Sequence, residues 1–234
     1  MAALLLAAGF CPVRLQFINA AAGQFFFSIT ALVVCLLYIV WLTNLYNFMD
    51  GMDGLAGGMS VIGFTFLAYF GLIKENDAFW LISLLLGVAS LGFLFFNFPP
   101  AKIFMGDVGS VPTGFMAAGM TLWGIRDNLF PFWAPLLIFS PFMVDASLTL
   151  GHRLYRREKI WQAHRSHYYQ RLVKLGWSHK KTALAEYCLM MVMGVTSVIL
   201  TRANNSFMTT TGILSAAGVY VLLAWVIHRK ETDS

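Results

Sequence analysis

Charged residues are scarce in this sequence. Asp, Glu, Lys and Arg make up 12% of its 234 residues, about half the share found in soluble domains, whereas 59% of the residues are hydrophobic. The mean hydropathy is +0.70. A chain with so few charges and with long apolar stretches does not fold as an ordinary soluble domain. The composition therefore indicates an integral membrane protein.

Cysteines are few, and acidic residues are missing from the start of the chain. The three cysteines, Cys11, Cys35 and Cys188, are odd in number, far apart, and lie in or beside apolar stretches. Their spacing matches no metal site, so we interpret them as small hydrophobic residues in a reducing or lipid setting. No Asp or Glu precedes Asp50. Tandem repeats and low-complexity segments are also absent from the sequence.

Seven apolar runs can be recognised, and most approach the roughly 20 residues that a helix needs to cross the hydrocarbon. They are approximately Leu15–Thr43, Leu55–Ile73, Phe79–Asn97, Val111–Ile125, Phe132–Leu150, Thr182–Thr201 and Phe207–Ile227. We predict one domain, residues 1–234, that folds as an all-α polytopic membrane bundle of about seven spans. The fourth run is short, and its glycines Gly114, Gly119 and Gly124 indicate a helix that is tilted, broken or closely packed.

The basic residues predict the orientation in the membrane. If the connections alternate between two sides, the side that carries residues 44–58 also receives 98–110, 151–181 and the C-terminal tail. That side has twelve Lys and Arg residues, and the other side has three. Cytoplasmic loops are enriched in Lys and Arg, so we predict that these connections, including the basic loop 151–181, face the cytoplasm. Membrane orientation also explains the net charge of +5 better than a nucleic-acid partner does.

The first polar motif is Asn44–Gly58, between the first two apolar runs. Asn44, Asn47, Asp50 and Asp53 are three residues apart, which places neighbours on adjoining parts of one helix face. The glycines that follow let the backbone turn or approach a ligand closely. A polar helix end that faces water is the simpler explanation for any single residue. For the whole pattern we favour a ligand or cation site at the membrane surface.

The second polar motif is Asn97–Ser110. Pro99 and Pro100 predict the end of the preceding helix, and Gly106 and Asp107 lead into the next run. A helix start favours anions, so a divalent cation between Asp107 and a phosphate would reconcile the carboxylate with that position. Asp107 as a simple helix cap is an equally good reading of this stretch.

The third polar motif is in the loop 151–181, where Arg165 lies between His164 and His167. These side chains could bind phosphate oxygens and carry protons near neutral pH. The zinc signal is weak, and a basic loop attracted to anionic lipid is a strong alternative. Asp145, at the end of the fifth run, is a candidate that we rank below Asp50, Asp53 and Asp107, because Arg153 could neutralise it.

At these three motifs the chain resembles the polyprenyl-phosphate N-acetylhexosamine-1-phosphate transferases, the bacterial enzymes that start peptidoglycan-lipid, O-antigen and teichoic-acid assembly. The stretch His164–Leu172 is more similar to the branch used for O-antigen and related glycans than to the muramoyl-pentapeptide branch, which has a histidine triplet there. The resemblance implies a multi-pass protein of the bacterial inner membrane with a cytoplasmic active face. It implies Mg²⁺-dependent transfer of a sugar phosphate from a UDP-N-acetylhexosamine to polyprenyl phosphate, with release of UMP. A homodimer is left open.

The resemblance also implies residue roles. Asp107 and Asp50 would bind Mg²⁺. Asn47 and Asp50 would order the diphosphate and metal region, and the catalytic set would be completed by His164, Arg165 and His167, which would contact the phosphates or the sugar. The substrate would be bound by Asn44, Gly51, Met52, Asp53, Asn97 and Phe104, of which Met52, Asp53, Asn97 and Phe104 would line the uridine pocket.

One departure from the family pattern affects the expected activity. The family carries an acidic pair or triplet on an earlier cytoplasmic connection, and this chain has no acidic residue before Asp50. The sequence therefore resembles the C-terminal two thirds of the usual enzyme, and we expect the chain alone to be inactive or nearly so. Two alternatives to a transferase remain at this stage: a transporter or channel, and a non-catalytic membrane remnant.

Overall fold

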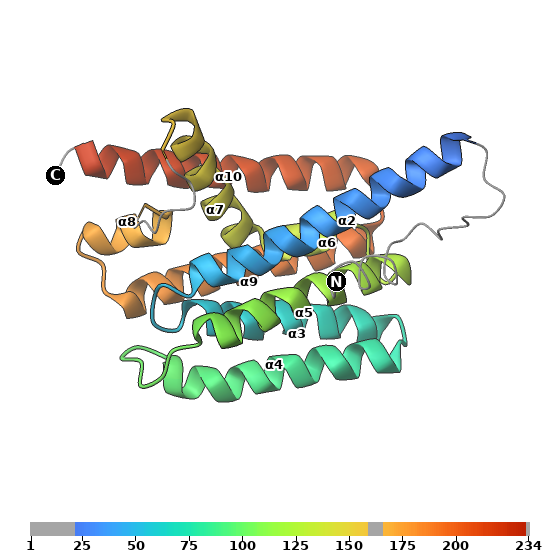
Figure 1. Ribbon diagram of the computed structural model, residues 1–234, viewed down its shortest axis with the longest axis horizontal. Coiled ribbons are helices and arrows are strands. Elements are labelled where there is room, and N and C mark those ends of the chain that lie inside the picture. Colours follow the sequence, from blue (N-terminus) through green and yellow to red (C-terminus); the bar gives the residue numbers. More distant parts are fainter. Residues whose placement is uncertain (1–21, 159–165, 233–234) are drawn as a thin grey trace.

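The structure, a computed structural model, describes residues 22–158 and 166–232. This part of the chain is helical, without a β-strand. The helices, in order along the chain, are α2 (Ala22–Met49), α3 (Leu55–Ile73), α4 (Asp77–Asn97), α5 (Gly106–Arg126), α6 (Trp133–Ile138), α7 (Ser140–Tyr155), α8 (Tyr168–Lys174), α9 (His179–Ala203) and α10 (Ser206–Thr232) (Figure 1). The predicted all-α membrane bundle is confirmed.

Five of the described helices are long and apolar enough to cross a membrane. They are Ile29–Met49 within α2, together with α3, α4, α9 and α10. Helix α5 is 21 residues long and begins at Gly106, so the helix starts within the second polar motif, as that motif predicts, and before the apolar run that begins at Val111. For the fourth run the structure shows close packing along α2, and it contradicts a break because α5 is continuous.

The fifth apolar run is not the single helix that its hydropathy predicts. It forms two helices, α6 and α7, which meet at Phe139. Pro141 occupies the first turn of α7, where a missing N–H is tolerated, whereas in a continuous helix its ring would collide with the preceding turn. The Ser140 hydroxyl donates to the Leu137 carbonyl at 2.6 Å and so satisfies one acceptor at the break.

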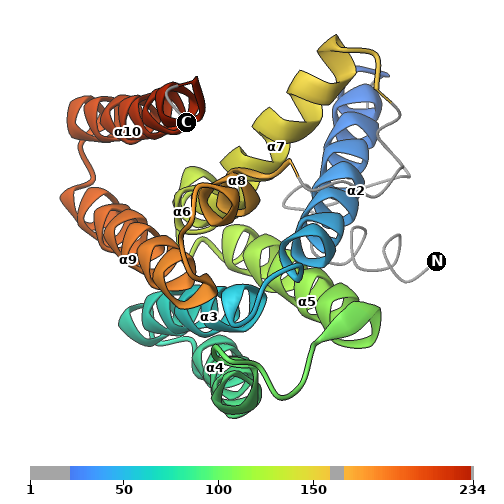
Figure 2. The same ribbon diagram turned by 90° about the vertical axis from the view of Figure 1, so that its left-hand side faces the viewer.

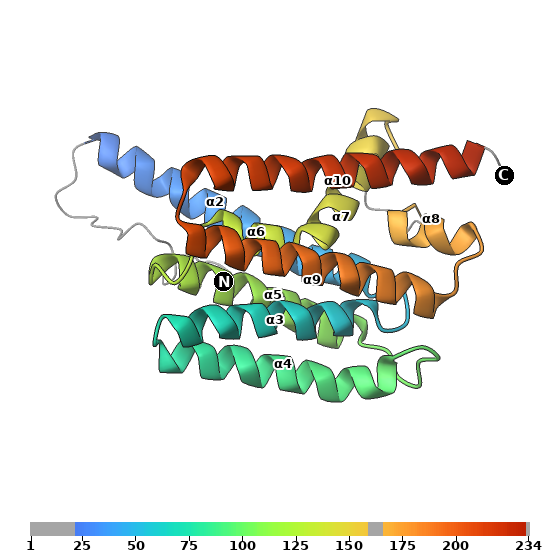
Figure 3. The ribbon, with the colours of Figure 1, turned by 180° about the vertical axis from the view of Figure 1, so that it is seen from behind.

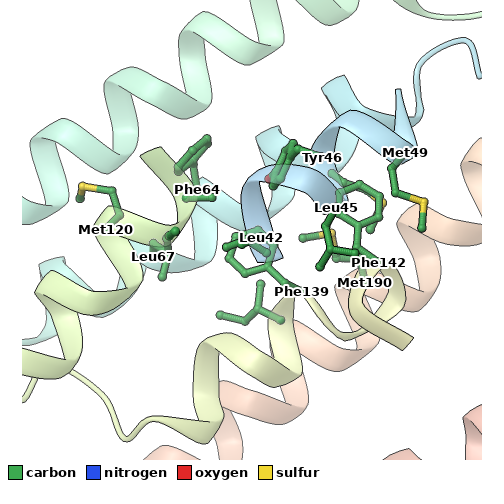
Figure 4. Close-up of a cluster of buried hydrophobic side chains, with 14 of the residues drawn as sticks. Leu42, Leu45, Tyr46, Met49, Phe64, Leu67, Met120, Phe139, Phe142 and Met190 are labelled. Carbon is green, nitrogen blue, oxygen red and sulfur yellow. The ribbon is translucent and has the colours of Figure 1, made fainter. Parts of the chain in front are cut away.

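The apolar core lies where α2, α3, α5, α6 and α7 meet (Figure 4). Leu42 and Tyr46 from α2 pack there with Phe64 and Leu67 from α3 and Phe139 from the α6–α7 junction. Each of these side chains is no more than 1% exposed. This packing fixes the C-terminal end of α2, which contains the first residues of the first polar motif.

The polar connections gather at one end of the bundle. The α2–α3 turn, the α4–α5 connection, α8 and the C-terminal end of α10 lie at the left in Figure 1 and at the right in Figure 3. The α3–α4, α5–α6 and α9–α10 connections lie at the opposite end. Figure 2 looks onto the first end and shows α10 at the edge of the bundle beside α9.

Candidate functional site

Two polar motifs that are far apart in the sequence meet at this end. The Asp50 Oδ2 atom accepts a hydrogen bond from the Gly106 N–H at 2.8 Å. Asn47, in the last turn of α2, donates to Asp107 Oδ1 at 2.6 Å and to the Ser110 hydroxyl at 3.2 Å. The structure therefore brings both predicted metal ligands to one place. Asp107 is not a simple cap of its own helix, because its carboxylate accepts from Asn47 of α2.

Two glycines make this approach possible. Gly106 has φ +57°, in the left-handed region where residues with a Cβ are strained, and its N–H reaches Asp50 in that conformation. Gly114 allows α5 to lie against α2, because a Cβ there would be 2.8 Å from Thr43 Cα and 2.9 Å from the Leu42 carbonyl oxygen. Close packing of two helices thus sets the distance between Asn47 and Asp107.

The electrostatics of the paired carboxylates favour a cation. Partial burial raises the pKa of Asp50, and the charge of nearby Asp107 raises it further, while the Gly106 N–H acts in the opposite direction. Within residues 22–158 and 166–232 no group of three or more His, Cys, Asp or Glu side chains could hold a metal ion. Two carboxylates suit Mg²⁺, which binds through one or two protein carboxylates and completes its shell with water and substrate phosphates. These residues therefore fit the ion that the resemblance implies.

A second set of contacts orders the connection between α4 and α5. Buried Asn97 accepts from the Gly54 N–H at 2.9 Å and donates to the Ile103 carbonyl at 2.8 Å. Asp53 Oδ2 accepts from the Ala101 N–H at 3.2 Å. Asn97 and Asp53 thus both tie this connection to the start of α3. These two polar side chains therefore hold the connection in place through contacts within the chain.

The remaining predicted substrate-binding residues differ in their surroundings. Met52 is 5% exposed and belongs to the apolar core, whereas Phe104 is 69% exposed beside the site. Asn44 is exposed and donates to the Val40 carbonyl of its own helix, so the structure does not join it to the Asp50–Asp107 pair. Gly51 is exposed in the α2–α3 turn.

Of the third motif, His164 and Arg165 lie outside the described residues. His167 is 2% exposed, and its Nδ1 atom is 3.1 Å from Asp145 Oδ1. Its ring stacks on Tyr169, with centroids 5.7 Å apart and planes at 16°. Asp145, which the sequence ranks below the other carboxylates, is thus a partner of the basic loop. Arg153 forms an ion pair with Glu158 at 3.0 Å and is not the neutralising partner that the sequence suggested for Asp145.

Three further contacts at this end were not predicted from the sequence. The Tyr169 hydroxyl donates to the Phe48 carbonyl at 3.2 Å. His179, the first residue of α9, places Nδ1 at 3.5 Å from Asp53 Oδ1. The Tyr187 hydroxyl donates to the Gly54 carbonyl. No local sequence signal predicts such contacts, because each of them joins residues more than one hundred positions apart.

Tyr187 also explains why the start of α3 is rich in glycine. A Cβ at Gly58 would lie 2.0 Å from the Tyr187 ring, and a Cβ at Gly54 would lie 3.1 Å from its hydroxyl. Gly54 also has φ +76°. The ring of one α9 residue therefore occupies the space that side chains at these two positions would need.

Fold and site together define a multi-pass membrane protein with paired carboxylates, glycine turns and a basic segment at one end. Its sequence matches the family description "Glycosyl transferase family 4" over residues 1–125, and the chain belongs to this family.

Curated relatives agree with this assignment. One is a "Probable undecaprenyl-phosphate N-acetylglucosaminyl 1-phosphate transferase" of Bacillus subtilis (strain 168), 35% identical over 170 residues, which cover 72% of this chain and 48% of the relative. Another is a decaprenyl-phosphate N-acetylglucosaminephosphotransferase of Mycobacterium leprae (strain TN), 30% identical over 227 residues, 86% of this chain and 56% of the relative. A phospho-N-acetylmuramoyl-pentapeptide-transferase of Staphylococcus aureus (strain bovine RF122 / ET3-1) is 29% identical over 188 residues, 78% of this chain and 55% of the relative. The chain spans about half the length of the curated relatives it matches.

Proposed function

We propose that this chain carries the metal-binding and nucleotide-sugar-binding part of a polyprenyl-phosphate N-acetylhexosamine-1-phosphate transferase. The observation that carries the proposal is the meeting of Asp50 and Asp107 at one end of a membrane bundle. The relatives' names supply the reaction class. In this reaction a phosphate oxygen of the lipid attacks the sugar-bearing phosphorus of a UDP-N-acetylhexosamine. A new phosphorus–oxygen bond forms, the bond to UMP breaks, and UMP leaves.

The described residues would contribute mainly by positioning charge. Asp50 and Asp107 would hold Mg²⁺, which when bound would neutralise diphosphate oxygens. The Asn47 amide donates to Asp107 and so fixes the direction of that carboxylate. The Gly106 N–H does the same for Asp50. Phe104, which is exposed beside the site, would offer an aromatic surface to the uracil ring.

The surface on which this site lies is proposed from the charge distribution. By alternation of the connections along the sequence, the side that receives Asp50 and Asp107 also receives twelve of the sixteen Lys and Arg residues. This excess favours the cytoplasmic face of the bacterial inner membrane, where a soluble nucleotide sugar would reach the site. A transport pathway would need polar groups at mid-membrane depth, whereas the site residues gather at one end of the bundle.

The proposal is tested by Mg²⁺-dependent binding of UMP and UDP-N-acetylglucosamine to the purified chain, followed as a rise in melting temperature. We expect Mg²⁺ and nucleotide together to stabilise the wild type. Asp50→Asn and Asp107→Asn should lose this effect. Asp77→Asn is the matched control, because Asp77 is an exposed carboxylate in the first turn of α4, at the opposite end.

A second measurement addresses the reaction itself. Membranes that contain the chain are supplied with polyprenyl phosphate and a UDP-sugar radiolabelled in the sugar, and label in the lipid fraction is counted. Transfer that depends on Mg²⁺ and on Asp107 would support the full activity. Nucleotide binding without transfer would agree with a chain that needs further acidic residues. If wild type and Asp107→Asn bind nucleotide equally, the assignment of the site is wrong.

A further inference from the structure

The carboxylate of Asp145 has an unusually complete set of hydrogen-bond donors. Its Oδ1 atom accepts from the Thr149 hydroxyl at 3.1 Å and from the Tyr168 N–H at 2.9 Å, and it lies 3.1 Å from His167 Nδ1. Its Oδ2 atom accepts from the Tyr169 N–H at 3.1 Å. An ionised carboxylate offers about four acceptor positions on its two oxygens, and here three groups contact Oδ1 and one N–H contacts Oδ2. Asp145 is 8% exposed, so these contacts replace water.

These contacts determine which nitrogen of His167 carries a proton. A carboxylate only accepts, so Nδ1 must be the donor in this pair. The ring also stacks on Tyr169 and contacts the tilted ring of Phe48, whose centroid is 6.2 Å away. A buried histidine that is fixed by a carboxylate and two aromatic rings cannot turn to meet a ligand as an exposed side chain can.

A short route leads from Asp145 to the proposed metal site. Asp145 holds the Tyr169 N–H, and the Tyr169 hydroxyl donates to the Phe48 carbonyl, two residues before Asp50. The same hydroxyl lies 2.5 Å from the position that a Cβ on Gly51 would take. One tyrosine therefore joins the Asp145 carboxylate to the turn that carries Asp50.

We propose that Asp145 is a positioning residue of this site: it fixes His167 and the first turn of α8, and through Tyr169 it sets the conformation of the Asp50 turn. The proposal rests on the proposed function for its effect on metal and nucleotide binding. Its structural half, the pairing of Asp145 with His167, does not depend on any activity. In this arrangement His167 is part of the support of the site, and substrate contact is left to other residues.

The middle of α8 provides a matched control. Arg171 forms a two-bond ion pair with Glu231 of α10, with Nε–Oε1 at 2.7 Å, and its guanidinium lies 4.6 Å from the Tyr168 ring centroid. Glu231→Gln removes a carboxylate that holds α8, as Asp145→Asn does, but this carboxylate pairs with the Arg171 side chain and not with the His167 ring. Any general loosening of α8 is therefore common to both variants.

The experiment is nitrogen-15 NMR of the full chain with labelled histidine in detergent, with His167 assigned through His167→Gln. We expect Nδ1 of His167 to be protonated in the wild type and in Glu231→Gln. In Asp145→Asn we expect this preference to be lost, because the asparagine amide presents donors to groups that need an acceptor. A wild-type spectrum with unprotonated Nδ1 overturns the proposal without any need for a folded variant, and so does an unchanged spectrum in Asp145→Asn.

The second measurement is Mg²⁺ and UMP affinity of the same proteins. We expect Asp145→Asn to weaken binding by about tenfold or more, as loss of a supporting carboxylate does at other ligand sites, and Glu231→Gln to change it much less. Equal affinities in wild type and Asp145→Asn overturn the link to the Asp50 turn. If the wild type binds neither ligand, the proposed function fails, and the spectra alone decide the pairing of Asp145 with His167.

Discussion

Replacement of Gly114 by alanine should separate the two helices that build the site. The added Cβ would lie 2.8 Å from Thr43 Cα, and ordinary contacts of a Cβ begin near 3.4 Å, so α5 must move away from α2 by about 0.6 Å. The neighbouring atoms are backbone and cannot rotate away. Overpacking of this kind costs about 1–3 kcal/mol. Alanine also favours a helix over glycine by about 1 kcal/mol, which would hide part of the effect.

A matched variant removes that ambiguity. Gly92 lies in α4, another 21-residue helix, and a Cβ there would meet no atom within 4 Å. Gly92→Ala therefore gains the same helix preference without the collision. We expect Gly114→Ala to be about 1–3 kcal/mol less stable than Gly92→Ala, a difference of roughly 2–12 °C in melting temperature for a chain of this size. Mg²⁺ should also stabilise Gly114→Ala less, because Asn47 moves relative to Asp107. Equal melting temperatures would refute the described packing of α2 on α5.

Three further outcomes can be checked by thermal unfolding of purified variants. Gly51→Ala should destabilise the protein, because the added Cβ would lie 2.5 Å from the Tyr169 hydroxyl oxygen. In a Tyr169→Phe background the cost should be much smaller, because the nearest ring atom of residue 169 is 3.7 Å from that Cβ. Additive effects in this double-mutant cycle would contradict the contact. Asn97→Ala should cost about 1–3 kcal/mol, since it leaves the buried Gly54 N–H without its acceptor, and a cost near zero would show that the N–H is satisfied otherwise. Without metal, stability should rise as pH falls through the raised pKa of Asp50, because in that range the folded chain binds a proton that the unfolded chain does not. Asp50→Asn should flatten this pH dependence of stability. An unchanged slope in Asp50→Asn would contradict the assignment to Asp50.

Much of the fold could be predicted because apolar runs of membrane length leave a helix few alternatives. The helix ends were less predictable. α2 continues to Met49 and includes Asn44 and Asn47, because polar residues can extend a helix beyond the apolar run. The break at Phe139 was missed because hydropathy does not register a proline in the first turn of a new helix.

The site was predictable in part for a different reason. Asp50 and Asp107 stand out as acidic residues beside membrane spans, and their sequence context points to a shared ligand. Asp145 is no less conspicuous, but its role depends on Tyr168 and Tyr169, more than twenty residues away along the chain. A pattern of residue types does not show which backbone N–H groups a carboxylate will meet. Only the packing of α7 against α8 provides that information.

The contact of Tyr187 with the start of α3 has a consequence for variation among homologues. Since the tyrosine ring fills the space beside Gly58, any residue with a side chain at position 58 should occur together with a smaller residue at position 187. An alignment deep enough to score pairs of columns should therefore show these two positions changing together. The positions are 129 apart in sequence number, so such covariation would have to arise from contact in space.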